Sequence, residues 1–419
     1  MTSSTIFFII IKKLVIYAFT IYQFFFEFTK EKGLEMPKKC AAIMDIGSSK
    51  ISVLIGQSGV NNSFIIKGVG ESEYAGFADG EFLEPENLKY AAALAISNAE
   101  KQAGMKIEAI FVGVPAEFSF CDCTEVETNF KKRVTIAEED VSYLYSKALN
   151  KELMKTKTLL SCRTLWFKLD DGRKIFDVEK QKSYKLRAKV SLIYVENSFI
   201  STFNDVLGEA GIVSVEYISS PLAQADFLLD QVERQRGAVV IDIGYITTSV
   251  SGVLGDGLAG LNSFSLGGAH ISGDFCEAFE ISFSEAEKLK NEIVLSVNSK
   301  KVGNYEVNVE NQVLFVPIVS ANEIVKERIE MFASLIKRCL QKISEQNLEN
   351  AQVYLTGGGL SYITGGREYL EECLGREIKI LAPNIPAFAK PHFSSAISVL
   401  SEALKKQNQS KNWFTKFFK

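Results

Sequence analysis

The sequence predicts an α/β fold in which two similar halves face each other across a cleft. The first observation is a repeated hairpin. An apolar strand, an Asp-Ile-Gly turn and a returning strand occur at Asp45 and again at Asp242, 197 positions later. The second is another apolar strand, residues 353–356, that ends directly in Gly357-Gly358-Gly359. The third is the alternation of strands and helices around these pieces, which is typical of mixed sheets flanked by helices.

The composition permits large cores and argues against several kinds of site. Hydrophobic residues make up 47% of the 419 residues, enough for two or three domains, and the net charge of −4 gives no indication of nucleic-acid binding. The seven cysteines form no Cys-x-x-Cys, which argues against a zinc site or a disulfide framework and fits a reducing cytosol. We interpret the two histidines, His270 and His392, as packed or surface residues rather than catalytic bases.

Residues 1–35 differ from the rest of the chain and allow two interpretations. The segment is rich in Phe, Ile and Tyr, but Lys12 and Lys13 interrupt it, and the apolar run at 14–26 is too short to span a membrane comfortably. It also has no small-residue cleavage site of the signal-peptide kind. It is therefore either a marginal membrane segment or a translated non-coding stretch ahead of a true start at Met36. We favour the second interpretation.

The first hairpin has the residue types of a phosphate-binding turn. Gly47 permits unusual backbone angles and the close approach of a ligand, and successive N–H groups in such a turn can converge on an anion. Ser48 and Ser49 add hydroxyl groups, Lys50 adds a positive charge, and Asp45 can hold a hydrated Mg²⁺. One such turn is usually only a turn. Two copies at this spacing predict that the phosphates of a nucleotide lie between the two halves.

Between the two hairpins the pattern of apolar and charged residues changes twice. A helix is expected over 84–103, with leucine and alanines on one face, and a buried strand follows at 109–114. Residues 118–195 contain charged strands and a helical piece near 138–151, which predicts an inserted small α+β unit. The pattern of apolar helices and strands then resumes, with a helix at 198–210, a strand at 213–218 and one helix at 223–233.

The second half repeats the first with different insertions. Helices are expected at 271–279 and 284–292, and a hairpin at 302–318. A long helix at 324–345 leads into the strand that ends in the glycine run, and a further helix follows within 360–374.

Two Asp-Ile-Gly hairpins followed by a Thr-Gly-Gly-Gly turn are the signature of the actin-like ATPase superfamily, and within it the chain most resembles the FtsA family of bacterial cell-division proteins. Segments 219–223 (Ser-Ser-Pro-Leu-Ala) and 266–271 (Leu-Gly-Gly-Ala-His-Ile) match as well, and the resemblance covers roughly residue 37 to the C-terminus. It implies an actin-like ATPase fold, with two α/β domains around a nucleotide cleft and a small α+β subdomain inserted in the first half.

The resemblance also implies a division of the chain. The inserted subdomain, of the FtsA type called 1C, would contact neighbouring subunits and division partners. The expected limits are 36–117 with 199–236 and about 388–404 for the first domain, 118–198 for the inserted subdomain, 237–262 and 329–387 for domain 2A, 263–328 for subdomain 2B, 405–411 for a linker and 412–419 for a terminal helix.

ATP and Mg²⁺ are the cofactors that the resemblance implies. Asp45 and Asp242 would hold the metal through water. No residue is assigned a catalytic role with assurance. The residues expected to bind the nucleotide are Asp45, Gly47, Ser48, Ser49, Lys50, Asp242, Gly244, Thr247, Thr248, Gly267, Gly268, Glu287, Lys290, Gly357, Gly358 and Gly359.

For Glu287 and Lys290, two interpretations stay open. They are three apart on one helical face, where they could form a surface ion pair of little energetic value. In actin-like proteins a Glu and a Lys at this spacing touch the ribose or adenine. The resemblance further implies that subdomain 2B receives the acidic C-terminal peptide of FtsZ, with Arg328 as a candidate contact.

The sequence departs from the FtsA pattern at two places. Tyr245 and Ile246 stand where the family usually has glycines, and a β-branched residue does not readily adopt a left-handed conformation. Ser220 stands where the family usually has a glutamate that can orient water. We therefore expect that the protein binds ATP and hydrolyses it slowly. The side chains of Tyr245 and Ile246 could also weaken ATP binding itself.

The last residues predict a membrane contact. After the polar linker 405–411, the aromatic residues fall on one helical face with lysines between them, as in an interfacial helix on an anionic membrane. A disordered tail is the alternative. The residues expected to meet the membrane are Trp413, Phe414, Phe417, Phe418, Lys416 and Lys419.

The implied function is that of a peripheral protein at the cytoplasmic face of the cell membrane. It would self-associate into filaments, tether FtsZ filaments, meet other division proteins and help to assemble the division septum. Two alternatives remain. A pilus-type actin-like scaffold would also act by assembly, whereas a sugar-kinase-like enzyme would need a catalytic aspartate in a substrate pocket, for which no motif is found.

Overall fold

We describe the protein from a computed structural model, which covers residues 40–60, 63–295, 303–309, 312–344, 348 and 350–409. The predictions for residues 1–35 and for Trp413, Phe414, Lys416, Phe417, Phe418 and Lys419 lie outside the described residues. Within the described part, no helix combines the length and the apolar character needed to cross a membrane.

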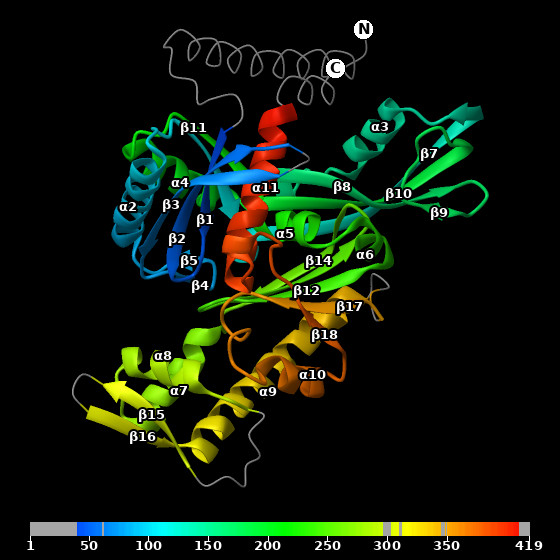
Figure 1. The fold of residues 1–419 in the computed structure, drawn as a ribbon. Helices are drawn as coiled ribbons and strands as arrows, with labels where there is room; N and C mark the ends of the chain where they lie inside the picture. Colours follow the sequence, from blue (N-terminus) through cyan, green and yellow to red (C-terminus); the bar gives the residue numbers. More distant parts are fainter. Residues whose placement is uncertain are drawn as a thin grey trace.

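Two five-stranded sheets share one strand order, and each contains one of the Asp-Ile-Gly hairpins (Figure 1). In both sheets the aspartate-bearing strand pairs antiparallel with the next strand and parallel with a strand from later in the chain. The predicted repeat is therefore confirmed. The first sheet contains β1 (Cys40–Ile46), β2 (Lys50–Ser58), β3 (Phe64–Glu73), β6 (Ala109–Val114) and β11 (Ser214–Ser219). The second contains β12 (Ala238–Ile243), β13 (Thr248–Leu254), β14 (Gly257–Phe264), β17 (Gln352–Thr356) and β18 (Ile378–Ile380).

Helices cover both faces of the first sheet. On one face lie α2 (Pro85–Ala103) and α4 (Asn197–Glu209), whose apolar residues join one core cluster with the strands. The opposite face is covered by α11 (Ser394–Gln409). The short helix α5 (Ser220–Leu228) lies between the two sheets, because its apolar residues belong to the core clusters on both sides. This helix helps to set the spacing between the halves.

A separate four-stranded sheet projects from the first half, as predicted for the inserted α+β unit. It contains β7 (Ser119–Thr135), β8 (Lys157–Leu169), β9 (Lys174–Ile175) and β10 (Lys182–Glu196). Helix α3 (Glu138–Ala148) packs against this sheet and closes a core of its own. In Figure 1 the far end of this sheet lies at the upper right.

The second sheet carries the remaining helices. The long helix α9 (Ile318–Ser344) packs against it together with α7 (Gly268–Phe279) and α8 (Phe283–Glu292). The predicted hairpin forms as β15 (Asn304–Val309) and β16 (Gln312–Pro317) at the lower end of the molecule (Figure 1). The short helix α10 (Gly366–Leu374) follows the glycine run.

One predicted helix is in fact two. The sequence suggested a continuous helix over 223–233, but α5 ends at Leu228 and α6 (Gln231–Arg236) begins anew. Asp230 starts the second helix: its carboxylate accepts a hydrogen bond from the Glu233 amide, and the Glu233 carboxylate accepts one from the Asp230 amide. This reciprocal capping box is a helix start signal that overrides the apolar pattern.

Other helix limits also differ from prediction. Helix α9 begins at Ile318 rather than 324, because Ala321 and Val325 already face the core, and α10 begins only at Gly366 rather than near 360. The predicted linker 405–411 is wrong for 405–409, since α11 remains helical to Gln409. Buried Leu404 anchors this end, and Asn408 Nδ2 donates to Ser58 Oγ at 3.1 Å.

Candidate functional site

The two hairpins face each other across a cavity of about 250 Å³. Its wall also includes the first turn of α5, the residues before η1 (Ala116–Phe118), the turn after β17 and the start of α11. This volume lies below the ~300–1,000 Å³ usual for ligand pockets. Of the residues predicted from the sequence, those that line the cavity are Asp45, Gly47, Ser49, Lys50, Asp242, Gly244, Thr247, Thr248, Gly357 and Gly358.

The same backbone turn closes both hairpins. In the first, the Gly47 amide donates to the Lys50 carbonyl at 3.0 Å, and in the second the Gly244 amide donates to the Thr247 carbonyl at 2.9 Å. Each turn directly follows the strand that carries the aspartate. The repeat found in the sequence therefore extends to the hydrogen bonding of the turn, and it places Asp45 and Asp242 on opposite walls.

Both aspartates are desolvated, and a neutral side chain binds each of them. Ser395 Oγ donates to Asp45 Oδ1 at 2.5 Å, and Gln224 Nε2 donates to Asp242 Oδ2 at 2.7 Å. Burial raises the pKa of Asp45 to about 6; Ser395 opposes this shift, and the charge of Asp242 adds to it. Burial also raises the pKa of Asp242, opposed by Gln224.

This donor set fits a hydrated Mg²⁺ rather than a metal held by protein ligands alone. Among the described residues no group of three or more His, Cys, Asp or Glu could hold a metal ion. Two facing carboxylates that have lost hydration would nevertheless gain from a cation between them, and Mg²⁺ keeps several waters and is usually bound through one or two carboxylates and substrate phosphates. Asp45 and Asp242 are the residues that would hold it.

The two hairpins also touch each other directly. The Ile246 amide donates to Ser48 Oγ at 2.9 Å, across a sequence separation of 198 residues. Neither Tyr245 nor Ile246 has a positive φ, so neither adopts the left-handed conformation that a β-branched residue disfavours. The Tyr245 ring instead packs edge-on against Phe283, with ring centroids 6.3 Å apart. The Tyr245 side chain thus packs within its own half, and the bond to Ser48 comes from the Ile246 backbone; the Ile246 side chain reaches the first half beside Gly76.

Several predicted phosphate ligands already have protein partners. Lys50 Nζ lies 2.7 Å from Glu71 Oε1, and both side chains are about 40% exposed. The Thr248 hydroxyl is buried and donates to the Leu266 carbonyl at 2.6 Å. A phosphate group could recruit Lys50 by breaking an exposed pair of low energy, but it would have to disrupt the turn to reach the Thr248 hydroxyl.

The glycines of the 357–359 run have different roles. Gly357 has φ +86°, and a Cβ there would overlap Asp242 Oδ1 and the Ile243 carbonyl. The Gly359 amide donates to that same carbonyl at 2.7 Å. These two glycines therefore allow close packing of the turn on the second hairpin, and it is Gly358 that remains as a surface for a ligand.

Six predicted residues lie outside the cavity lining: Ser48, Gly267, Gly268, Glu287, Lys290 and Gly359. Lys290 is buried, pairs with Glu287 at 2.6 Å and donates to the Gly268 carbonyl at 3.2 Å. The surface-pair interpretation is therefore wrong for Lys290. The two residues support the turn before α7, and their contact with a ribose or adenine stays a prediction.

Arg328, the predicted partner contact, is engaged within the protein. Its Nε donates to Asp274 Oδ2 at 2.7 Å, and its second nitrogen pairs with the other carboxylate oxygen. Such a two-point pair is among the stronger side-chain interactions. Arg328 therefore joins α9 to α7 in the structure and is not presented as an open cation.

Three side chains at the cavity, those of Gln224, Ser395 and Glu117, were not identified from the sequence, whereas Ser220 was. Gln224 and Ser395 bind the two aspartates, as described above. Ser220 Oγ is buried, and it has no hydrogen-bond partner in the described part of the chain. Glu117 accepts from Ser265 Oγ at 2.9 Å, and burial raises the pKa of its carboxyl. Gln224, Ser395 and Glu117 belong to no local motif, because their positions depend on helices that pack together from distant segments.

Comparison with known proteins relates this architecture to one family. Residues 239–398 match the family described as "Cell division protein FtsA". The cell division protein FtsA of Streptococcus pneumoniae serotype 2 is 26% identical over 362 residues, covering 85% of this chain and 78% of that protein. That of Rhizobium meliloti is 25% identical over 390 residues, covering 86% of each.

Solved structures show the same fold at lower identity. The PilM–PilN type IV pilus biogenesis complex matches with a TM-score of 0.57 and 15% identity, covering 88% of this chain and 99% of that chain. MreB5 of Spiroplasma citri bound to ADP matches with a TM-score of 0.52 and 12% identity, covering 90% and 100%. The fold predicted from the hairpins, that of the actin-like ATPases, is thereby confirmed.

Proposed function

We propose that this chain, which has the actin-like ATPase fold and is similar to the cell division protein FtsA, binds ATP with Mg²⁺ and tethers FtsZ filaments to the cytoplasmic face of the cell membrane. It would do so as a peripheral scaffold at the division site, where it helps to assemble the septum. The single observation that carries the nucleotide part is the pair of hairpin turns, closed by the same backbone hydrogen bond, that face each other across one cavity, each following a partly buried aspartate.

The nucleotide would lie with its phosphates between the hairpins. Gly47 and Gly244 leave room for phosphate oxygens near the turns, and Ser49 and Thr247 stand at the cavity wall as hydroxyl donors. Mg²⁺ would neutralise phosphate charge and the two desolvated carboxylates. Since the cavity is small and the hairpins touch through Ser48 and Ile246, binding requires the halves to separate.

Hydrolysis is expected to be slow. Ser220 stands at the cavity wall and carries no carboxylate that could position an attacking water. The carboxylate of Glu117 also reaches this wall, but its position is fixed by Ser265. ATP would therefore act mainly as a ligand that favours one arrangement of the halves and, with it, self-association into filaments.

The C-terminal peptide of FtsZ is proposed to dock on the subdomain of residues 263–328. Its core contains α7 and α8 with the β15–β16 hairpin. Because Arg328 is bound by Asp274, we assign it to the support of this surface rather than to direct peptide contact. Other division proteins would meet the inserted subdomain of residues 118–198.

Attachment to the membrane is proposed for the aromatic face of residues 412–419. Burying a large apolar side chain contributes about 1.5–3 kcal/mol when complete, and an interface gives only part of that. One tail would thus bind weakly, whereas a filament presents many tails and attaches firmly through effective concentration.

Calorimetric titration of ATP tests the nucleotide site. We expect binding that depends on Mg²⁺ and is weakened at least about tenfold by Asp242→Ala, without loss of the folded state. Asp205→Ala, which alters an exposed residue on α4, is the matched control and should bind as the unaltered chain does. If the unaltered chain has no affinity for ATP, the proposed nucleotide function is wrong.

The two alternative functions predict other results. A small-molecule kinase would transfer phosphate from ATP to a metabolite in a substrate screen. A pilus-type scaffold would not sediment with FtsZ filaments, whereas the proposed tether would. The structural similarity to the pilus protein reports the fold and does not distinguish these two scaffolds.

A further inference from the structure

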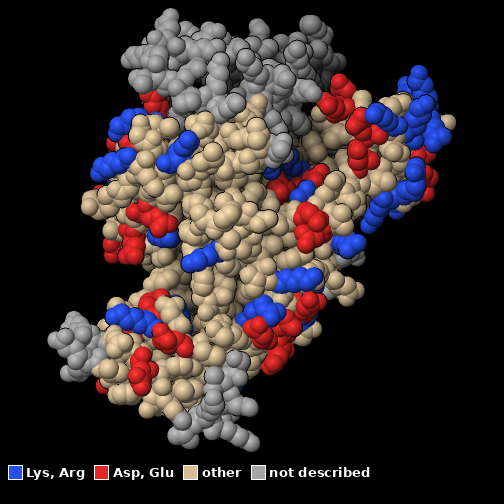
Figure 2. Space-filling view, in the orientation of Figure 1, with Lys and Arg blue, Asp and Glu red and all other residues tan. Residues whose placement is uncertain are grey.

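The free end of the inserted sheet is basic, although the protein as a whole is acidic. We define the basic tip as residues 129–135 and 168–187, which contain ten Lys or Arg against four Asp or Glu in a chain of net charge −4. Figure 2 shows these cations gathered at the upper right of the molecule, over the ends of β7, β9 and β10. The proposed function assigns the inserted subdomain as a whole to division partners but gives these cations no role of their own.

An irregularity in the sheet projects three consecutive cations. Strands β7 and β10 pair regularly up to Asn129 opposite Lys185, and pairing resumes at Val134 opposite Ser183. Residues 130–133 of β7 therefore face a single residue of β10, Tyr184. Extra residues of this kind form a bulge that turns side chains away from the ladder. Lys131, Lys132 and Arg133 are all exposed.

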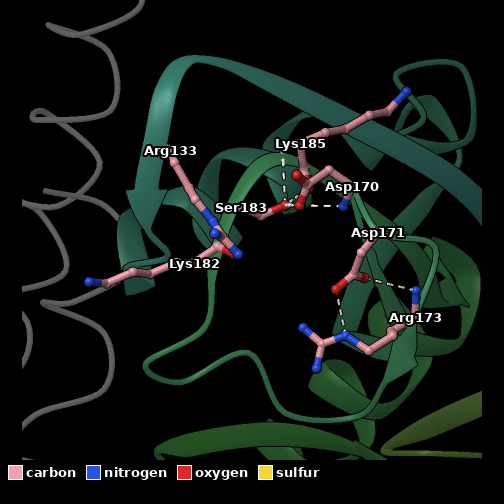
Figure 3. A network of polar contacts seen from close by, with 7 residues as sticks. All are labelled: Arg133, Asp170, Asp171, Arg173, Lys182, Ser183 and Lys185. Atoms are coloured by element: carbon pink, nitrogen blue, oxygen red, sulfur yellow. Dashed lines mark hydrogen bonds and ion pairs between the residues drawn. The ribbon is translucent and has the colours of Figure 1, made fainter.

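The carboxylates of the tip are already engaged by neighbours (Figure 3). Asp171 Oδ2 accepts from Arg173 Nε at 2.6 Å, and Asp170 pairs with the Ser183 hydroxyl. Glu179 lies 3.2 Å from Lys180 Nζ, and Asp177 accepts the Glu179 amide at 2.8 Å. Asp171 and Glu179 thus lie beside cations, whereas Asp170 and Asp177 are bound by neutral groups and keep their charge, so the tip remains net positive because its cations outnumber its carboxylates.

Six cations of the tip, Lys168 among them, have no carboxylate partner among the described residues. Arg133 Nε reaches only the Lys182 carbonyl, at 3.4 Å, and the Lys182 ammonium points away from both aspartates in Figure 3. Lys174 Nζ lies over the Trp166 ring, 4.6 Å from its centre. Lys131 and Lys132 enter no ion pair in the described part of the chain. The exposed ring of Tyr184 (52%) stands among them.

The position of the tip favours a flat anionic surface as its partner. In Figure 1 the C-terminal end of α11 lies at the upper edge of the view, and the tip of β7 lies at the upper right, toward the same side. A membrane held by residues beyond Gln409 would therefore approach the tip as well. An aromatic ring among lysines suits the headgroup layer, where amphipathic rings and cations gather.

We propose that the basic tip is a second membrane contact, which binds the phosphate-bearing headgroups of an anionic bilayer. The proposal rests on the membrane attachment proposed above. It adds an electrostatic contact with the bilayer to the contact made by the aromatic tail. Two points separated along the molecule fix its orientation on the bilayer, whereas one short tail leaves it free to tilt. Each Lys or Arg near an anionic surface adds about 1 kcal/mol, or roughly fivefold in affinity, and the effect falls with ionic strength.

The test is flotation of the full chain with vesicles of phosphatidylglycerol and phosphatidylcholine, or of phosphatidylcholine alone. The tip variant combines Lys131→Gln, Lys132→Gln and Arg133→Gln. We expect it to bind anionic vesicles at least about tenfold more weakly at low ionic strength, and the difference should shrink as salt is raised. Circular dichroism should show unchanged folding because all three side chains are exposed.

A matched control removes equal charge elsewhere. Lys337→Gln, Arg338→Gln and Lys342→Gln alter exposed cations on α9, which lies away from the upper edge in Figure 1. This control should bind anionic vesicles as the unaltered chain does. Equal losses in both triple variants would show only a net-charge effect and would overturn the proposal.

The tail variant, Trp413→Glu with Phe417→Glu, separates this proposal from the proposed function. It should keep weak, salt-sensitive binding to anionic vesicles at low ionic strength, and adding the tip substitutions should remove that binding. If the tail variant floats as well as the unaltered chain, the proposed anchor fails while the tip is judged on its own variant. If the unaltered chain does not float at low ionic strength, both ideas fail.

Two other partners are outcomes of the same test. Inorganic phosphate that displaces vesicles far more than chloride at equal ionic strength would indicate a discrete anion site, and would overturn the membrane assignment. Poly-glutamate binding that depends on the tip, with vesicle binding unaffected by the tip variant, would assign the tip to an acidic polypeptide and also overturn it.

Discussion

Two carboxylates in the cavity, those of Asp45 and Asp242, lose hydration, and neither forms an ion pair in the described part of the chain, although the charge of Lys50 acts on Asp45. Ser395 and Gln224 supply one neutral hydrogen bond each, which offsets part of the cost of burial. The remainder appears as a raised pKa for both carboxyls. The protein thus carries an electrostatic cost in the cavity that a bound cation would relieve.

The first prediction concerns pH. The pKa of Asp45 is about 6 in the folded protein and about 3.9 in the unfolded chain, so folding disfavours its ionised form. This cost is absent below about pH 4, grows as pH rises and is complete above about pH 6. We expect Asp45→Asn to unfold like the unaltered chain at pH 4 and to be more stable by about 1–3 kcal/mol at pH 7.5. Urea unfolding at several pH values measures this. A difference independent of pH would contradict it.

A second prediction concerns the residues that replace the family's glycines. Tyr245→Gly with Ile246→Gly removes the Tyr245 side chain from the cavity wall and the Ile246 side chain from its place beside Gly76 of the first half, which eases separation of the hairpins. We expect tighter ATP binding by calorimetry, together with lower stability by about 1–2 kcal/mol from the added backbone freedom. An unchanged or weaker affinity would mean that these side chains do not hold the site closed.

Sequence alone identified the hairpin residues because their chemistry is local. The aspartate, the glycine and the hydroxyl residues lie within a few positions of one another, and both turns form as expected. Gln224 and Ser395 could not be predicted, since Ser395 lies 350 residues from the carboxylate that it binds. The hydrogen bond from the Ile246 amide to Ser48 could not be predicted either, because it depends on the distance between the two halves.

Among the structural elements, the turn after β17 links the second sheet to its hairpin most tightly. Gly357 combines a φ of +86° with a site where a Cβ would overlap Asp242 Oδ1. The turn therefore couples its own backbone geometry to the position of a predicted metal ligand. A substitution in this turn should therefore alter ligand binding in the cavity as well as the stability of the fold.

The third prediction separates these two effects. Gly357→Ala adds a Cβ where there is no room, whereas Gly172→Ala adds one at nearly the same φ, +83°, with no atom within 4 Å. The control should be less stable only by the cost of a left-handed backbone conformation, about 1–2 kcal/mol. Gly357→Ala should lower the stability measured by thermal unfolding by clearly more than the control does. It should also lose Mg²⁺-dependent ATP binding. Equal losses in the two variants would show that the cavity wall adapts freely.

Element types were more predictable than element limits. Apolar periodicity located the helices, but the break at Asp230 depended on a capping box hidden inside an apolar run. The polar stretch 405–409 suggested a linker from composition, yet α11 continues because its other face is buried against the first sheet. Tertiary packing decides such limits, and a single sequence shows it only in part.

At the scale of the whole molecule, two sheets of one topology are joined by α5, and the inserted sheet extends from the first half (Figure 1). This arrangement separates three proposed contacts: the cavity between the halves, the subdomain of residues 263–328 and the edge where α11 ends. A tether needs such separation, because it must hold a filament and a membrane at once.

The fourth prediction concerns the tail. Trp413→Glu with Phe417→Glu should reduce flotation with anionic vesicles by at least about tenfold at physiological ionic strength, since two apolar anchors are lost and negative charge is added. ATP binding by the same variant should be unchanged. Lys411→Gln, next to the aromatic face, is the milder control. Full flotation of the double variant would remove the tail as the main anchor.

The most direct test of the account is recruitment of FtsZ to anionic vesicles by this protein, measured by co-flotation with and without Mg²⁺ and ATP. We expect FtsZ to float only when this protein is present, to float more with ATP, and to stay in solution when its own C-terminal peptide is removed or when the tail variant is used. FtsZ that remains in solution while this protein binds the vesicles would contradict the proposed tether.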